Sequence, residues 1–322
     1  MSRRGDVEEA RLERALASMA PVVERYDPLL RERSPGLALW RAAVADVQAG
    51  NLDDRPLYWA RLRLGCMLRD RDESMAVAEP QSRGLLRTSD GDAPGILLTG
   101  FDPFRLDADI GQSNPSGLAA LALDGTLIAG SRVQSAILPV RYVDFDSGVV
   151  EDYLAGHFAN GLDLAVTVSM GRDAFDLERF PGRRRSTTEP DNRGEYGGGS
   201  PKEPLPPPGL DGPEFLEFSL PGESMVRVGG RWPVRDNREV QTLRGLLTVR
   251  SLADLNGETA VSGSGGGYLS NEVAYRSLLL GRRLGVDFPI GHIHTPVLRG
   301  HDESLEGAIV DQIRRLIEAA LP

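Results

Sequence analysis

The chain has 322 residues, of which 40% are hydrophobic, so it can bury a full core and form one large or two modest domains. Its 47 acidic and 37 basic side chains give a net charge of -10, which argues against a surface for nucleic acid or anionic membranes, since both need clustered cations. The single cysteine, Cys66, excludes an internal disulfide framework. The sequence shows neither a secretory signal nor an apolar run long enough to span a membrane, so we expect a cytoplasmic protein with no membrane partner.

Residues 1–90 have the pattern of an N-terminal helical extension. Apolar residues recur at helical spacing in three segments, which are separated by breakers containing Pro, Gly or Asn. The segments are marked by Leu12, Leu16, Met19 and Val23, then by Trp40, Val44 and Val47, and then by Tyr58, Leu62 and Cys66. We predict three amphipathic helices. Their apolar stripes need a partner, which is either the rest of the chain or, in a homo-oligomer, a second copy.

The pattern of residues 94–322 predicts a second domain, which follows a polar linker over residues 83–94. Apolar strands are expected at 95–99, 133–138, 164–169, 259–262 and 288–294, and helices at 116–123, 143–158, 238–255, 271–284 and 305–321. Alternating strands and helices of this kind indicate an α/β fold with three layers, α/β/α, around a mixed, mostly parallel central sheet.

The segment Ser264-Gly-Gly-Gly-Tyr-Leu-Ser270-Asn271 carries the strongest chemical signal in the chain. Its glycines let the backbone approach a ligand, and Ser270 stands at an expected helix start, where a side chain feels the positive end of the helix dipole. Such a turn can present a nucleophile, although serine here is also a good helix N-cap. His294 ends an expected strand and Glu178 offers a carboxylate, so a nucleophile, a base and an orienting acid are all available. The alternatives are a buried structural histidine and a surface carboxylate.

No metal site is expected from the histidines. His292 and His294 are separated by one residue with no further ligand nearby, and His157 and His301 stand alone.

The order of these motifs resembles the pyroglutamyl peptidase I family, cysteine amidohydrolases that remove an N-terminal pyroglutamate from peptides. The further matching blocks are Leu98-Thr-Gly-Phe101-Asp-Pro-Phe104, Asn114-Pro115-Ser116, Leu138-Pro139-Val140, Arg172 and Glu178 at the family spacing, and Pro190-Asp191-Asn192 followed by Gly194. The resemblance covers about residues 94–322 and implies a phosphorylase/hydrolase-like fold for this catalytic domain. Residues 1–90 have no counterpart in the compact members of the family.

The resemblance also implies roles for individual residues. By position, Glu178, Ser270 and His294 fall on the family's Glu, Cys and His, so Ser270 Oγ should lie within hydrogen-bond reach of His294, with Glu178 on the other ring nitrogen. Phe101, Phe104 and Tyr268 match the positions that flank the pyroglutamyl ring, and Arg172 matches an arginine that is expected to contact substrate. The implied substrate is a small peptide or amide, and the implied hydrolysis needs no cofactor.

The sequence departs from the family pattern at the nucleophile. Serine stands where the family has cysteine, and a hydroxyl must lose its proton to the base during attack, whereas a thiol ionises easily beside an imidazole. Three interpretations stay open: a natural relative that uses serine, a homologue that binds but does not catalyse, and an altered sequence in which cysteine was replaced to trap a complex. An acyltransferase that uses the same site is a further alternative.

Two other departures concern the substrate. The family usually has a glycine-rich run before its arginine, but this chain has Thr167-Val-Ser-Met-Gly171, so strict specificity for pyroglutamyl groups is not expected. Residues 194–233 form a Gly- and Pro-rich insertion, whose composition favours an extended or mobile segment. It is interpreted either as a lid over the pocket or as a surface loop or a replaced oligomer contact.

Overall fold

A seven-stranded mixed sheet forms the centre of the protein in the computed structural model, which describes residues 6–71, 73–86 and 95–321. The strand order is β2-β3-β1-β4-β10-β5-β6. The strands are β1 (Ile96–Phe101), β2 (Leu127–Ile128), β3 (Ser131–Leu138), β4 (Leu164–Met170), β5 (Phe175–Glu178), β6 (Val234–Asn237) and β10 (Ile290–Thr295). The strands β3, β1, β4 and β10 are parallel, whereas β5 pairs antiparallel with β10.

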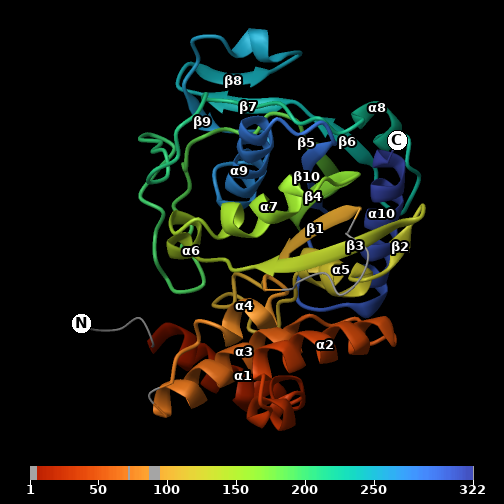
Figure 1. Cartoon of the computed structure of the whole chain (residues 1–322). Helices are drawn as coiled ribbons and strands as arrows, with labels where there is room; N and C mark the ends of the chain where they lie inside the picture. The colour runs from red at the N-terminus through yellow and green to blue at the C-terminus, as the bar shows by residue number, and fades with distance from the viewer. Residues whose placement is uncertain (1–5, 72, 87–94, 322) are drawn as a thin grey trace.

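Helices cover both faces of this sheet, as expected for apolar parallel strands that are buried on both sides (Figure 1). On one face α5 (Pro115–Leu123) packs against α10 (Glu303–Ala320), and on the other α7 (Val149–Ala159) packs against α9 (Leu269–Leu284). Two short helices, α6 (Tyr142–Asp146) and α8 (Gly222–Met225), complete the set. The predicted three-layer α/β/α fold is therefore confirmed, although the helix expected over 143–158 is divided at Gly148, which has a φ of 89°.

A second sheet corrects one prediction. Residues 238–255 were expected to be a helix but contain the strands β7 (Glu239–Thr242) and β8 (Gly245–Thr248) and the 3-10 turn η2 (Leu252–Leu255). These strands form an antiparallel sheet in the order β8-β7-β9, so the expected strand at 259–262, which is β9 (Ala260–Ser262), lies outside the central sheet. Val240 and Thr242 are buried while Glu239 is exposed, which is a period of two rather than a helical period.

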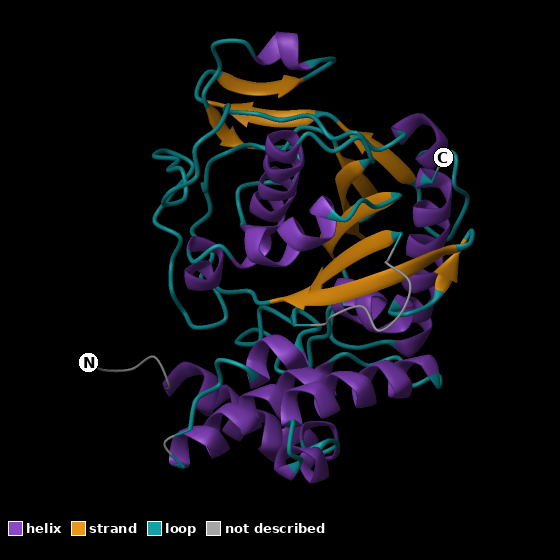
Figure 2. Ribbon diagram, viewed as in Figure 1, coloured by secondary structure: helices purple, strands orange, loops and turns teal. Residues whose placement is uncertain are grey.

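The N-terminal helices pack on the α/β core within the same chain (Figure 2). They are α1 (Asp6–Val23), α2 (Pro35–Gln48), α3 (Arg55–Asp70) and the short α4 (Ala78–Ser82), with a 3-10 turn η1 at Asp27–Arg31. Helix α2 lies against α5, and its buried residues join the core cluster of the α/β domain. A Cβ at Gly36 would stand 2.1 Å from the carbonyl oxygen of Ala78, so glycine allows α2 and α4 to approach. Most of the predicted polar linker, residues 87–94, lies outside the described residues.

The Gly- and Pro-rich insertion runs along α9. Tyr275 of α9 donates a hydrogen bond to the carbonyl of Pro213, and an isolated bridge pairs Arg185 with Leu205. Arg185 also forms a buried ion pair with Glu272 of α9, at 2.6 Å between Nε and Oε2. Except for α8, which packs against α10, the insertion is irregular.

Candidate functional site

The residues expected to act chemically line one cleft at the ends of three elements. Glu178 is the last residue of β5, His294 lies near the end of β10, and Ser270 is in the first turn of α9. All three line a cleft of about 650 Å³. The pairing of β5 with β10 places Asp176 beside His294, so the end of β5 brings Glu178 to the imidazole.

Glu178 holds the imidazole of His294 in one orientation. Its Oε1 lies 2.6 Å from His294 Nδ1, and its side chain is only 1% exposed. A carboxylate accepts at this position, so Nδ1 carries a proton and Nε2 is the ring nitrogen left for other partners. Glu178 thus lies on one ring nitrogen, in the geometry that the resemblance implies.

Asn237 is a site residue that the sequence did not point to. Its Nδ2 donates to Glu178 Oε2 and to the carbonyl oxygen of Ser264, both at 2.9 Å. It ends β6, which pairs in parallel with β5 so that Glu178 and Asn237 are neighbours. The only sequence signal was an amide next to an insertion, which is too common to identify it.

Ser270 does not bond to His294 in this structure. Its Oγ donates instead to the carbonyl oxygen of Gly265, at 3.3 Å. A Cβ built on Gly265 would lie 3.5 Å from both His294 Cε1 and Glu178 Cγ, so the residue whose carbonyl accepts from Ser270 lies close to the His294–Glu178 pair. The helix N-cap is Tyr268, so Ser270 is not the capping residue.

The glycine-rich turn before Ser270 is fixed by a double hydrogen bond. Asn271 Nδ2 donates to the carbonyl of Gly182 at 2.7 Å, and the N–H of Gly182 donates back to Asn271 Oδ1 at 2.9 Å. A Cβ on Gly263 would lie 2.2 Å from Asn271 Oδ1, and Gly266 has a φ of +89°. These two positions require glycine for different reasons, one for space and one for backbone conformation.

The three aromatic residues expected to flank a ligand lie around a small hollow beside Ser270. Phe101, Phe104 and Tyr268 line a space of about 40 Å³, together with Asn114, Val140, Ser169, Met170, Leu269 and Ser270. The Tyr268 hydroxyl donates to the carbonyl of Pro190 at 3.0 Å. Burial, followed by the charge of Asp191, raises the pKa of Tyr268, so its hydroxyl is neutral. We call this space the aromatic slot.

Arg172 stands at the rim of the cleft. Its side chain is 64% exposed, and its guanidinium reaches Asp176 at 3.5 Å. Its guanidinium is therefore open to solvent and accessible to a ligand that enters the cleft.

Residues from two further parts of the chain also line the cleft. The β7–β8 hairpin contributes Gln241 and Leu246, and α1 contributes Arg11. By contrast, the insertion over residues 194–233 contributes none of the lining, so in this structure it does not form a wall of the cleft.

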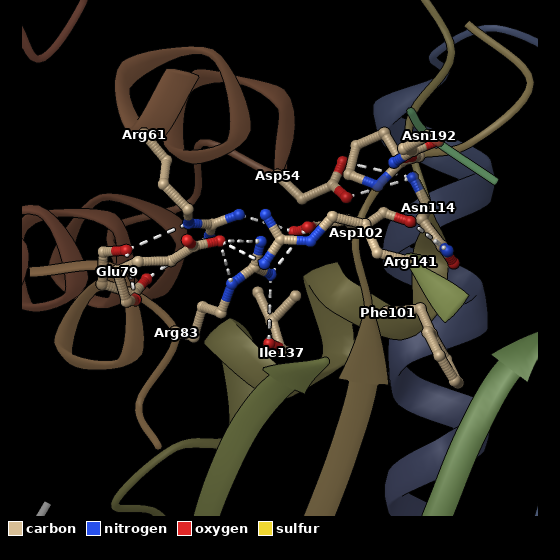
Figure 3. A network of polar contacts seen from close by, with 12 residues as sticks. Asp54, Arg61, Glu79, Arg83, Phe101, Asp102, Asn114, Ile137, Arg141 and Asn192 are labelled. Atoms are coloured by element: carbon tan, nitrogen blue, oxygen red, sulfur yellow. Dashed lines mark hydrogen bonds and ion pairs between the residues drawn. The ribbon is translucent and has the colours of Figure 1, made fainter. Parts of the chain in front are cut away.

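A buried polar network behind the slot connects it to the N-terminal helices (Figure 3). Asp102 follows Phe101 and is paired with Arg61 of α3 at 2.8 Å and with Arg83 at 2.7 Å. Its carbonyl accepts from Asn114 Nδ2 at 2.9 Å, and Asn114 N–H donates to Asp54. The N-terminal region therefore braces the loop and the amide that line the slot.

The structure offers no obvious metal site or membrane span in the part of the chain that it describes. No group of three or more His, Cys, Asp or Glu residues there is placed to hold a metal ion, and no helix there is long and apolar enough to cross a membrane.

Comparisons with known proteins agree with this architecture. A family model described as "PA0049, C-terminal domain" matches residues 95–232 and 233–299, and one described as "PA0049 N-terminal domain" matches residues 6–90. The uncharacterized protein PA0049 of Pseudomonas aeruginosa is 28% identical over 87% of this chain and 72% of its own length. A pyrrolidone-carboxylate peptidase of Deinococcus radiodurans is 30% identical over 63% of this chain and 78% of its own length. The structure of a mutant pyrrolidone carboxyl peptidase from Pyrococcus furiosus superposes with a TM-score of 0.50 at 25% identity, covering 70% of this chain and 97% of that one.

Proposed function

Because the chain belongs to the PA0049 family and, through its α/β domain, to the pyrrolidone-carboxylate peptidases, we propose that it is an amidohydrolase acting on peptides or amides with a small cyclic or N-acyl group at the N-terminus. Pyroglutamyl groups are one member of this substrate class. The observation that carries the proposal is the juxtaposition of the His294–Glu178 pair and the aromatic slot, with Ser270 lining both the cleft and the slot.

The proposed reaction begins with a rotation of the Ser270 side chain. Turning χ1 releases the hydroxyl from the Gly265 carbonyl and lets it donate to His294 Nε2. As Oγ attacks the acyl carbonyl, the proton passes to Nε2, and Glu178 stabilises the imidazolium that forms. Nε2 then gives this proton to the leaving amine. Water, activated by the same imidazole, hydrolyses the acyl-serine ester, and no cofactor takes part.

The first turn of α9 is suited to hold the negative charge that develops on the carbonyl oxygen. The N–H groups at a helix start have no partner within the helix, and the dipole is positive there. Ser270 lies in this turn, so the N–H groups of residues 267–270 are the proposed oxyanion donors. Arg172, at the rim, is proposed to assist them or to bind the peptide beyond the scissile bond.

A binding protein without catalysis is the second candidate. The observation that favours it is the bond from Ser270 to the Gly265 carbonyl, which turns the hydroxyl away from the imidazole. In such a protein the slot and cleft would hold an acylated peptide terminus without cleaving it.

The test compares the native chain with Ser270→Cys and Ser270→Ala on a panel of pyroglutamyl and N-acyl amides. Ser270→Cys should create or greatly increase turnover, because the rest of the site resembles one built for a thiolate and an imidazole. Ser270→Ala should lose any turnover that the native chain has, by about 10³-fold or more. Intact-mass measurement should detect an acyl adduct at residue 270. A serine form faster than the cysteine form would instead indicate a natural serine hydrolase.

Two other outcomes separate the alternatives. Ligand binding with no adduct and no turnover in either the native or the cysteine form would favour the binding protein. Product formation that depends on an added amine would favour an acyltransferase.

A further inference from the structure

His292 is a fully buried imidazole directly beside the imidazole of His294. It has no solvent exposure, and the two ring centroids lie 4.9 Å apart in an edge-to-face arrangement. Both its nitrogens meet hydroxyls of the neighbouring strand β4: Nδ1 lies 2.7 Å from Thr167 Oγ1, and Nε2 lies 2.8 Å from Ser169 Oγ. Burial, and then the neighbouring His294, lower the pKa of His292 well below its usual value, so the ring is neutral.

The contacts around His292 indicate which of its ring nitrogens carries the proton. Thr167 Oγ1 also lies 3.3 Å from the carbonyl of Gly291, which can only accept. The one arrangement that uses all three contacts has Thr167 donating to that carbonyl and accepting from Nδ1–H of His292. A neutral imidazole protonated on Nδ1 has an acceptor at Nε2, so the proton of the Ser169 hydroxyl points at His292.

A Ser169 hydroxyl that donates to His292 keeps lone pairs that can accept from a group in the aromatic slot, which Ser169 lines. The Ser169 residue is only 5% exposed. The pairing of β4 with β10 places it beside His294. The other polar side chains around the slot have partners or a different task. Asn114 bonds to Asp102 and Ser116, the Tyr268 hydroxyl bonds to Pro190, and Ser270 is the proposed nucleophile.

We propose that Ser169 determines specificity by accepting a hydrogen bond from an N–H group of the acyl moiety in the slot, with His292 as the positioning residue that keeps its proton away from the ligand. This rests on the proposed function, which it deepens by naming the group that is read. The favoured substrates are lactams and secondary N-acyl groups. Rings with CH₂, oxygen or N-methyl at that place leave the Ser169 lone pair without a donor and are disfavoured.

The size of the slot agrees with a small planar group. Its volume of about 40 Å³ leaves room for a group no larger than roughly three water molecules. A ligand that fills it has few contacts to lose, so one N–H···O bond can account for much of the selectivity.

The experiment measures discrimination between two ligands that differ in one group. The native chain, Ser169→Ala and the control Thr99→Val are titrated with 5-oxoproline amide and with its carbocyclic analogue, in which CH₂ replaces N–H. The same acyl groups on a chromogenic amine are used to measure kcat and KM in the Ser270→Cys background. Thr99 is a suitable control because its buried hydroxyl lies on the adjacent strand β1 and has no hydrogen-bond partner in the structure.

We expect the native chain to bind the N–H ring about 10- to 100-fold more tightly than the carbocycle, because the carbocycle leaves the buried Ser169 acceptor without a donor. Ser169→Ala should reduce this ratio to within about threefold, by weakening binding of the N–H ring, and Thr99→Val should leave the ratio unchanged. The change should also appear in KM more than in kcat, since Ser169 does not touch the transferred proton.

The two hypotheses fail in different ways. If turnover occurs and Ser169→Ala keeps the native ratio, the role of Ser169 is overturned while the hydrolase stands. If nothing is turned over but Ser169→Ala abolishes discrimination in binding, the role of Ser169 is supported while the hydrolase fails. A native chain that binds the carbocycle as tightly as the N–H ring also overturns the inference.

Discussion

Asn237 decides how the carboxylate of the site meets the imidazole. Glu178 is almost fully buried, and a buried carboxylate oxygen without a donor costs free energy. Asn237 supplies the donor to Oε2 while His294 occupies Oε1. It also bonds to Ser264, so one amide links the acid to the glycine-rich turn.

Replacing this amide should impair catalysis more than binding. For Asn237→Ala we expect kcat to fall about tenfold or more, because Asn237 orients the carboxylate that holds the imidazole. We expect KM to change less than about threefold. Steady-state kinetics on the most active form measures both. The exposed amide Asn256 gives a matched control, since Asn256→Ala removes the same group at a residue that does not line the cleft. A larger effect on KM than on kcat would contradict the orienting role.

The glycines of the turn should differ in their tolerance of a methyl group. A Cβ at Gly263 would collide with Asn271 Oδ1 and with the backbone nitrogen of Gly182 at 2.3 Å, whereas one at Gly265 meets only ordinary contacts. Gly263→Ala should therefore lower the free energy of unfolding by about 1–3 kcal/mol or more, and Gly265→Ala by less than about 1 kcal/mol. Urea unfolding measures the two side by side. Equal losses would mean that the turn adapts freely.

At the scale of elements, α1 contributes to the walls of the cleft. Arg11 of α1 is 4% exposed and donates to Asp107, with 2.9 Å from Nε to Oδ1, and to the backbone carbonyl of Asn192. Asn192 Nδ2 in turn donates to the carbonyl of Pro103 at 2.8 Å. This chain of bonds joins α1 to both loops beside Phe104, so the N-terminal helix fixes a wall of the proposed substrate site.

Arg11 and Arg14 provide a matched pair to test this. Both reach Asp107, but Arg14 is 51% exposed. Arg11→Ala should destabilise the protein by about 1–3 kcal/mol, because it removes a buried side chain and leaves the buried carbonyl of Asn192 without this donor, and should raise KM. Arg14→Ala should change stability by less than about 1 kcal/mol and leave KM unaltered. Thermal unfolding measures the stability of both variants, and steady-state kinetics measures their KM. Equal changes of KM in the two variants would show that α1 is not part of the substrate site.

Across the whole molecule, ion pairs buried behind the slot couple the helical region to the α/β core. Glu79 of α4 accepts from Arg83 at 3.1 Å and from Arg141 of the core. Burial alone would raise the pKa of Glu79, but the guanidinium groups of Arg83 and Arg141 outweigh it and lower the pKa to about 2. The folded pKa lies below the unfolded value of 4.5, so the stabilisation is complete above about pH 4.5 and is lost as the pH falls toward 2.

This coupling predicts a specific acid sensitivity. The stability difference between the native chain and Glu79→Gln should shrink by about 2 kcal/mol between pH 5.5 and pH 3, which follows from the two pKa values. Urea unfolding at the two pH values measures it, and other carboxylates cancel in the difference. A difference that stays constant would show that Glu79 is not held ionised by these arginines.

Elements whose signal is local were predictable from the sequence. The strands β1, β3, β4 and β10 are apolar runs that need both faces covered, and the N-terminal helices show their period of apolar residues and their Pro and Gly breakers. The residue order around Phe101, Glu178, Ser270 and His294 likewise identified the family, and the last three residues line one cleft in the structure. By contrast, residues 238–255 contain apolar residues that also fit a helical spacing, and only the pairing of β7 with β8 and β9 selects the hairpin.

The partners of the site residues were decided by tertiary structure alone. Asn237 reaches Glu178 because β6 pairs with β5, Ser169 and Thr167 reach His292 because β4 pairs with β10, and Arg11 reaches the cleft because α1 packs against the α/β domain. The rotamer of Ser270 in the folded chain likewise decides that its hydroxyl bonds to Gly265 and not to His294. The sequence by itself determined which chemical groups are present and which segments are strands or helices, because these follow from local patterns. Which of those groups face one another depends on strand order and packing between residues far apart in the chain, and these contacts exist only once the sheet has formed.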